Sequence, residues 1–389
     1  MTRVIMAGGG IAGLACALAA AQAGYKAVVL EQTEVFEEVG AGIQMGPNGR
    51  RALEALGVWE HVAPQVVYPE GIRIRRASDG AELGFLPAGE AFKQRFGSTY
   101  QLVHRADLLQ GLLEAARQAG AVELRTGFKV ARFDATGEAV SVTGETGETI
   151  AGDGLAGTDG IRSAIRAQLL ADGPPVFAGH MLYRALMDIS QVPPGVDTAN
   201  VNLWLHKGGH VVHYPVSGGR KFNIVASINE SWDGKSLNKP SRGERLNAIF
   251  AHVAGPLRSV LEMPGKWLRW VGADRKPVNR WGQGRVTLAG DAAHPTLPYL
   301  ASGAVMALED AVILGQCLQA VAAENIQAAL RAYERTRQPR TARIVKNSHR
   351  LAGIYHASQP LAFFRDRFIR FHTGQGGLER MAWLYSWQP

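Results

Sequence analysis

The chain has 389 residues, of which 46% are hydrophobic and 20% charged, and a net charge of +8. This length suits two domains or one elaborated domain, and a basic surface suits anionic ligands such as pyrophosphates and carboxylates. No block of Lys and Arg interleaved with aromatics is present, which argues against nucleic-acid binding.

The sequence also argues against membrane, secreted and metal-binding proteins. The sequence contains no run of 18 apolar residues that would suggest a membrane-spanning helix, and no signal peptide is evident. The cytoplasm is therefore the expected location. The two cysteines, Cys16 and Cys317, lie in apolar helical patterns and form neither a disulfide framework nor a metal motif.

The first seventy residues predict the start of a parallel sheet. An apolar strand at 3–7, an Ala/Leu-rich helix at 11–23 and a second strand at 26–31 form a βαβ unit. A helix is expected around 48–56. The alternating residues 71–86 then predict two antiparallel strands that turn at Asp79-Gly80.

The rest of the chain alternates between helix-and-strand patterns typical of a parallel sheet and strand patterns typical of an antiparallel sheet. A helix is expected at 108–119, followed by a strand meander at 122–126, 128–135 and 139–143. Residues 182–230 are strand-like and aromatic, and a buried strand returns at 285–289 before helices at 303–320 and 325–350.

The predicted fold class is therefore α/β, with a Rossmann-like nucleotide-binding domain interleaved with a smaller antiparallel-sheet substrate domain, plus C-terminal helices. The expected nucleotide-binding domain comprises 1–70, 100–180 and 275–345. The expected substrate domain comprises 71–99 and 181–274, and 346–389 form the C-terminal helical segment.

A glycine loop follows the first strand and begins the first helix. Gly8 permits the tight turn, Gly10 admits a pyrophosphate, and Gly13 lets the helix pack on the strand. Ile11 and Ala12 open the helix, whose N-terminus attracts phosphate. Glu31 ends the second strand, where an acid accepts a hydrogen bond from a ribose hydroxyl. The same string recurs at 152–157 without a preceding apolar strand, and we interpret it as a chance match.

A second candidate nucleotide-contacting segment lies near residue 290. The strand at 285–289 ends in Gly290-Asp291, and Asp291 there could hydrogen-bond a ribityl hydroxyl of a flavin. The alternative is that Asp291 caps the next turn. Gly303 and Ala304 begin a helix whose positive dipole end would stabilise a reduced flavin ring if it faced that ring.

With these motifs the chain resembles the single-component FAD-dependent aromatic hydroxylases. The resemblance rests on the glycine loop with Glu31, on Asp159-Gly-Ile-Arg-Ser163 and on Gly290–Pro295, supported by Gly40–Ile43, His104–Leu108 and the terminal Trp383-Leu-Tyr385. Tyr299–Ala307 is similar to the branch of 3-hydroxybenzoate 6-hydroxylases, which lies near the salicylate and 6-hydroxynicotinate hydroxylases.

The resemblance implies roles for further residues at the cofactor. Arg105 would contact the FAD pyrophosphate, and Gly42 and Ile43 would lie near the flavin ring. Asp159 and Arg162 would belong to a segment associated with both FAD and the nicotinamide coenzyme. The alternatives are a surface arginine at a helix start for Arg105 and an ordinary Asp-Gly turn for Asp159.

The candidate catalytic residues lie in His210-Val-Val-His213-Tyr214. Side chains alternate along a strand, so His210 and Tyr214 share one face and His213 takes the other. The related branch has a His and a Tyr four residues apart at the substrate, which favours His210 and Tyr214 over His213. Pro298 is a further candidate substrate contact, although some relatives carry glutamine there. The alternative is a set of satisfied core residues.

The implied function is hydroxylation of a small anionic phenol with NADH or NADPH and O2 through a flavin C4a-hydroperoxide. The first choice is 3-hydroxybenzoate to 2,5-dihydroxybenzoate. Salicylate, 6-hydroxynicotinate or a larger polycyclic or quinone-like ring are alternatives, and a non-catalytic nucleotide-binding regulator is a third reading. The family's usual form implies a homodimer. No second nucleotide motif indicates whether NADH or NADPH is used.

Overall fold

The computed structural model describes residues 2–36, 40–234, 236, 238–373 and 375–389. Its first layer is a parallel sheet of five strands in the order β18-β11-β1-β2-β7. These strands are β1 (Arg3–Ala7), β2 (Lys26–Leu30), β7 (Val122–Arg125), β11 (Gly154–Gly157) and β18 (Val286–Leu288). They come from distant parts of the chain, and their carboxyl ends meet at one edge.

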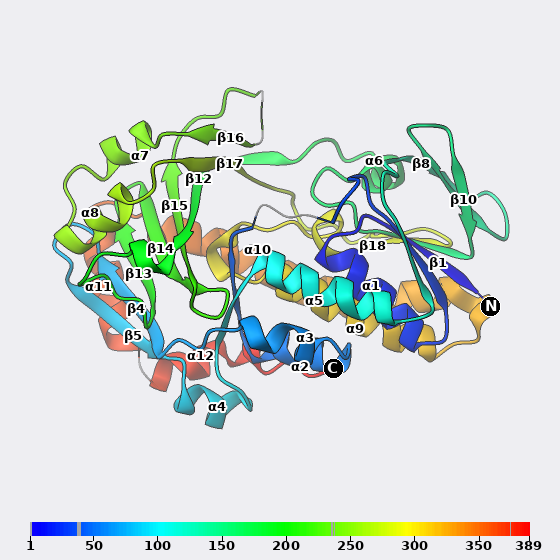
Figure 1. Cartoon of the computed structure of the whole chain (residues 1–389), viewed down its shortest axis with the longest axis horizontal. Helices are drawn as coiled ribbons and strands as arrows, with labels where there is room; N and C mark the ends of the chain where they lie inside the picture. The colour runs from blue at the N-terminus through cyan, green and yellow to red at the C-terminus, as the bar shows by residue number, and fades with distance from the viewer. Residues whose placement is uncertain (1, 37–39, 235, 237, 374) are drawn as a thin grey trace.

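Helices cover this parallel sheet. Helix α1 (Ile11–Gln22) packs against α5 (Arg105–Gln118) and α9 (Gly303–Gln319), and these helices lie beside the sheet in Figure 1. A Cβ atom at Gly315 of α9 would lie 2.9 Å from Ala19 Cβ of α1. Glycine at that position therefore permits the close approach of α1 and α9.

The second layer is an eight-stranded, mostly antiparallel sheet in the order β16-β17-β12-β15-β14-β13-β4-β5. Its strands are β4 (Gly71–Arg76), β5 (Glu82–Pro87), β12 (Val176–Asp188), β13 (Val201–His206), β14 (Gly209–Val216), β15 (Lys221–Asn229), β16 (Asn238–Ser241) and β17 (Trp267–Asp274). Helices α7 (Glu244–Ile249) and α8 (Gly255–Glu262) contribute to the core on one face of this sheet.

The C-terminal helices connect the two layers. Helix α10 (Ile326–Tyr355) contacts β18 and α9, and its last residue, Tyr355, packs against the hydrophobic cluster of Leu83, Leu203 and Leu205. Helices α11 (Leu361–His372) and α12 (Gln375–Tyr385) lie near β4 and β5 (Figure 1). No helix among the described residues is long and apolar enough to cross a membrane.

Smaller elements complete the fold. Strands β3 (Gly42–Met45) and β6 (Gln101–His104) form a two-stranded sheet, and β8 (Val130–Asp134), β9 (Val140–Gly144) and β10 (Thr149–Gly152) a three-stranded one. The remaining helices are α2 (Pro47–Ala55), α3 (Trp59–Val62), α4 (Glu90–Phe96) and α6 (Ala164–Leu170), with 3-10 turns η1 (Ala63–Gln65), η2 (Ile189–Gln191), η3 (Gly290–Ala292), η4 (Pro298–Leu300) and η5 (Ala323–Asn325).

The α/β fold class predicted from the sequence is confirmed, but the predicted meander is partly wrong. Residues 122–125 pair in parallel with β2 rather than antiparallel with the strands that follow. They continue the Rossmann-like sheet because α5 returns the chain to that sheet's edge. In contrast, the glycine string at 152–157 runs through β11 itself, which agrees with its interpretation as a chance match.

Candidate active site

The glycine loop at the end of β1 has the geometry that its sequence predicts. Gly8 has a φ of +115°, and a Cβ there would lie 2.5 Å from the carbonyl oxygen of Thr158. A Cβ at Gly13 would overlap the Gly8 carbonyl oxygen. Both glycines are required by the close packing of β1, β11 and α1, and this packing directs the N-terminus of α1 towards the sheet edge.

The structure leaves room and hydrogen-bond donors for a pyrophosphate at this loop. A Cβ built on Gly10 would meet no atom within 4 Å. No side chain caps the N-terminus of α1, which begins at Ile11 and Ala12. The Glu31 carboxylate accepts hydrogen bonds from the Gly9 amide at 2.9 Å and from the Thr33 amide at 3.0 Å. Open space, free amides and an anchored carboxylate fit the phosphate and ribose of a dinucleotide.

The segment after β18 packs against the same loop. Gly290 has a φ of +58°, and its Cβ would lie 2.6 Å from Ala12 Cβ, so the turn lies directly against the start of α1. Asp291 follows in η3 and is exposed. The two motifs predicted to hold the cofactor are therefore adjacent, although Gly13 and Gly290 are 277 positions apart along the chain.

A buried charge network that sequence reasoning missed holds this segment in place. Asp310 Oδ2 accepts from the Gly290 amide at 2.9 Å and lies 2.6 Å from His294 Nε2. Arg337 Nε donates to Asp310 Oδ1 at 2.8 Å, and Arg337 also pairs with Glu309. These partners hold the pKa values of both carboxyl groups below their usual range despite burial. The sequence did contain a signal for this network, namely Glu309 and Asp310, two adjacent acids inside the otherwise apolar helix α9.

Asp159 and Arg162 follow β11 at the same sheet edge but differ in environment. Asp159 Oδ2 accepts from the Ala164 amide at 2.7 Å and the Ile165 amide at 3.2 Å, so it caps α6, and burial raises its pKa. Its other oxygen, Oδ1, is buried and has no hydrogen-bond partner. Arg162 is exposed. The unpartnered Oδ1 is free to accept a hydrogen bond from a ligand.

Arg166, which the sequence did not single out, connects this segment to η3. Its fully buried guanidinium donates to the carbonyl oxygens of Ala292 and Ala293 at 2.9 and 2.8 Å, and to Asp172 at 2.6 Å. Arg166 therefore holds the turn at η3 against α6 and the segment that follows it.

Strand β3 joins the nucleotide region to the antiparallel sheet. The Gly42 amide donates to Asn223 Oδ1 on β15 at 2.8 Å, and a Cβ on Gly42 would overlap the Tyr214 ring, with the hydroxyl 2.8 Å away. Ile43 follows in the same strand. Arg105 begins α5, and its amide donates to Ala41 at 3.1 Å. Gly42 thus lies where the expected flavin region meets the candidate substrate face.

On β14, His210 and Tyr214 share the face that the alternation predicts. His210 pairs with Ser227 and Tyr214 with Asn223 across the β14–β15 ladder. Both side chains are buried, with exposed fractions of 5% and 3%. Burial, followed by the neighbouring His356 and His180, lowers the pKa of His210 well below its usual value. His210 is therefore neutral at neutral pH and has one nitrogen lone pair.

His213 lies on the opposite face, inside the core beneath α7 and α8. Its Nε2 accepts from Trp204 Nε1 at 3.0 Å, and the two rings lie at 27° to each other. Burial lowers its pKa to about 3. This placement argues against the predicted catalytic role, because the side chain points away from Gly42 and the cofactor loop.

Pro298 is exposed, whereas the next residue, Tyr299, is buried beside His210. The Tyr299 ring lies 5.2 Å from the His210 ring, and its hydroxyl is 3.0 Å from Ser227 Oγ. The Tyr355 ring, at the end of α10, lies 5.3 Å from the His210 ring and 6.1 Å from the Tyr299 ring. Tyr299 is thus a better candidate than Pro298 for a residue near the substrate.

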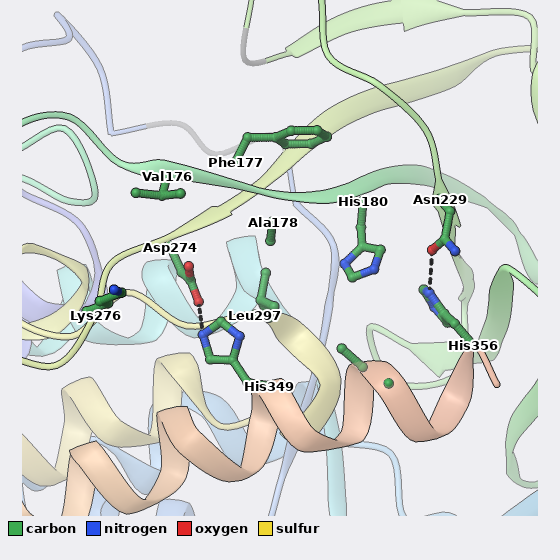
Figure 2. A pocket seen from close by; sticks show the side chains of 12 residues that line it. Val176, Phe177, Ala178, His180, Asn229, Asp274, Lys276, Leu297, His349 and His356 are labelled. Carbon is green, nitrogen blue, oxygen red and sulfur yellow. Dashed lines mark hydrogen bonds and ion pairs between the residues drawn. The ribbon is translucent and has the colours of Figure 1, made fainter. Parts of the chain in front are cut away.

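A pocket of about 600 Å³ opens beside this cluster between β12, β17 and α10. Figure 2 shows His180, Asn229 and His356 gathered on one wall, and an ion pair between Asp274 and His349 on another. Within the described part of the chain, no group of His, Cys, Asp and Glu side chains could hold a metal ion.

A glycine loop of this shape, connected by β3 to a buried His–Tyr face on an antiparallel sheet, is the arrangement expected of an FAD-dependent enzyme. The chain belongs to the FAD binding domain family, whose model matches residues 1–348. FAD is accordingly its cofactor, and the open glycine loop fits it.

Relatives over nearly the whole chain are aromatic-ring monooxygenases. The chain is 39% identical to "3-hydroxybenzoate 6-hydroxylase" of Polaromonas naphthalenivorans, covering 99% of this chain and 96% of that protein. It is 37% identical to "3-amino-4-hydroxybenzoate 2-monooxygenase" of Streptomyces cremeus, covering 99% and 95%. These relatives and the family make this protein a flavoprotein aromatic-ring monooxygenase, as the sequence predicts.

Solved structures agree with this assignment. The structure of Klebsiella pneumoniae HpxO with FAD and uric acid superimposes with a TM-score of 0.86 at 27% identity, covering 98% of this chain and 95% of that one. A salicylate hydroxylase substrate complex superimposes with a TM-score of 0.85 at 25% identity, covering 100% and 96%.

Proposed function

We propose that the protein hydroxylates 3-hydroxybenzoate to 2,5-dihydroxybenzoate, using NADH or NADPH and O2. The observation that carries this proposal is near full-length similarity to several proteins named 3-hydroxybenzoate 6-hydroxylase, at 34–39% identity. The buried His210–Tyr214 face beside Gly42 supplies chemistry that suits a phenol. The division into interleaved nucleotide and substrate domains remains part of the proposal, with the origin of the strands in each sheet as support.

At the cofactor, the proposed contacts come from the glycine loop, the ends of β2 and β18, and the starts of α5 and α9. The amides of Gly10 to Gly13 would bind the pyrophosphate together with Arg105, and Glu31 a ribose hydroxyl. Asp291 would bind the ribityl chain, and Gly303 and Ala304 would direct the α9 dipole at the ring. Bound FAD supplies the redox chemistry, accepting hydride from the nicotinamide and activating O2.

Asp159 and Arg162 remain proposed contacts of FAD or the nicotinamide. The buried, unpartnered Asp159 Oδ1 supports this role, because it can accept a hydrogen bond from a ligand hydroxyl or amide. The exposed Arg162 guanidinium is available to a phosphate approaching from solvent.

At the substrate, His210 would take the proton of the phenol. A phenolate attacks electrophilic oxygen far better than a phenol, and a neutral imidazole has the lone pair needed to accept the phenol proton. Burial raises the pKa of Tyr214, so its hydroxyl stays protonated and can donate a hydrogen bond to a substrate carboxylate or hydroxyl. Gly42 and Ile43 would lie between this face and the flavin.

The proposal is tested by measuring NADH and NADPH oxidation by the FAD-loaded enzyme against a substrate panel. The panel contains 3-hydroxybenzoate, salicylate, 6-hydroxynicotinate, 3-amino-4-hydroxybenzoate and a bulky polycyclic phenol, and products are identified chromatographically. We expect 3-hydroxybenzoate to give the highest kcat/KM and 2,5-dihydroxybenzoate as product. Preference for another substrate, or peroxide release without product, would overturn the substrate assignment.

We also propose that the enzyme is a homodimer, as the family resemblance implies, and the cytoplasm stays its predicted location. Helix α11 presents Leu361, Phe363, Phe364, Phe368 and Phe371 to solvent, and an apolar patch of this kind is unusual on a monomer. Sedimentation equilibrium should give twice the chain mass. A single-chain mass at micromolar concentration would contradict the dimer.

A further inference from the structure

His210 is the innermost member of a chain of hydrogen-bonded side chains that leads out to the pocket. His210 Nδ1 lies 2.9 Å from His356 Nε2, and His356 Nδ1 lies 2.8 Å from Asn229 Oδ1. His210 is buried, His356 is half-buried and Asn229 is exposed. Figure 2 shows the last link, with His356 and Asn229 facing each other at the pocket wall.

The direction of these hydrogen bonds follows from the amide oxygen at the outer end. Asn229 Oδ1 only accepts, so His356 carries its proton on Nδ1. A neutral imidazole has one N–H, which makes His356 Nε2 an acceptor. His210 must then donate from Nδ1, and its own lone pair is on Nε2.

The surroundings keep both rings neutral. Burial, followed by the nearby His180, lowers the pKa of His356 to about 3. The titratable groups facing the pair are His180 from β12, Tyr299 from η4 and Tyr355 from α10. Burial raises the pKa of both tyrosines to about 12, so none of these neighbours is an anion at neutral pH.

We propose that His356 is a positioning residue that holds His210 as the Nδ1–H tautomer and so makes Nε2 the base for the substrate phenol. This inference rests on the proposed function. In the step itself the phenol O–H bond breaks, an N–H bond forms at His210 Nε2, and the substrate becomes a phenolate. The resulting imidazolium donates from Nδ1 to His356 Nε2, which stabilises its positive charge.

The test compares His356→Gln with His356→Leu. The Gln carbonyl oxygen can accept from His210 Nδ1, whereas Leu cannot. We expect His356→Gln to keep kcat within about threefold and His356→Leu to lose about 10- to 100-fold near pH 7, the scale of losing an orienting partner. The loss in His356→Leu should shrink as pH approaches about 10, where a phenol ionises without a base.

A loss that is equal in both variants and independent of pH would mean that His356 only supports the fold, and would overturn the proposal. Asn229→Leu is a milder second variant, since it removes the group that fixes the His356 tautomer but keeps the ring. It should show a smaller loss with the same recovery at high pH. His252→Gln, at an exposed histidine outside the cluster, is the matched control and should leave the pH profile unchanged.

A second readout does not depend on turnover. Nitrogen NMR of histidine-labelled protein distinguishes protonated from unprotonated ring nitrogens. We expect His210 to be protonated at Nδ1 in the native protein and in His356→Gln, and to become predominantly Nε2–H in His356→Leu. Native His210 as the Nε2–H form would overturn the inference. Failure to hydroxylate any phenol, with the NMR result as expected, would instead overturn the proposed function alone.

Discussion

At the residue scale, strand β14 carries two buried histidines on opposite faces of the sheet. His210 faces Tyr299 and His356, while His213, three residues later, accepts from Trp204 in the core. Strand alternation predicted this separation from the sequence. The partners of His210 could not be predicted in this way, because His356 is 146 residues away and is brought there by the end of α10.

Replacing His210 separates chemistry from cofactor binding. His210→Ala should keep FAD and lower the hydroxylation rate by about 10²- to 10⁴-fold, the usual contribution of a general base. Stopped-flow absorbance of the flavin with product quantification measures both. The matched variant His213→Ala should instead lose about 1–3 kcal/mol of stability, because the Trp204 N–H loses its partner. Normal turnover of His210→Ala would remove His210 from the mechanism.

The lowered pKa values of Glu309 and Asp310 predict that the folded protein loses stability in acid. Their pKa values in the folded protein lie below the reference values of 4.5 and 3.8. A depressed folded pKa contributes stability that is present above the unfolded value and is lost as pH falls through the folded value. Unfolding free energy should therefore be steady above about pH 5 and fall below it.

Asp310→Asn tests this assignment, since it keeps the shape but removes one charge from Arg337 and His294. We expect a loss of about 3–5 kcal/mol at neutral pH, as for a broken buried ion pair, and a weaker dependence on pH below 5. Denaturant titrations at several pH values supply the measurement. An unchanged acid slope would mean that this carboxyl group does not link pH to folding.

At the element scale, the cofactor site depends on how closely α1, α9 and η3 approach one another. Glycine spacing and the apolar strands predicted the elements themselves. The sequence did not predict that Arg166 and Asp310 both hold η3, because each contact joins residues that are distant along the chain. The placement of 122–125 was also wrong, since a short strand of ordinary composition does not reveal its neighbour in a sheet.

A substitution at Gly315 tests the close packing of α1 against α9. Gly315→Val would force side-chain atoms into Ala19 and should cost about 1–3 kcal/mol, as overpacking does, with weaker FAD binding because α9 would shift. Gly353→Ala, in α10 with no atom within 4 Å of the added Cβ, should instead gain about 0.5–1 kcal/mol from helix propensity. Thermal unfolding with flavin fluorescence follows both. Equal effects of the two changes would contradict close packing at Gly315.

At the scale of the whole molecule, β3 brings the glycine-loop region and the proposed substrate face of the antiparallel sheet together. The fold class, the cofactor and the class of enzyme could all be predicted from the sequence, because each depends on local motifs with clear structural contexts. The substrate is harder to predict, because the side chains proposed to contact it come from η4, β14 and α10 and meet only in the folded protein.

An aromatic-ring monooxygenase transfers one oxygen atom from O2 to its substrate ring. The most direct measurement is mass spectrometry of the product formed from 3-hydroxybenzoate and NADH under O2 enriched in heavy oxygen. We expect 2,5-dihydroxybenzoate carrying a single heavy oxygen atom, formed in proportion to the NADH consumed. A product without heavy oxygen, or NADH consumption that yields only hydrogen peroxide, would contradict it.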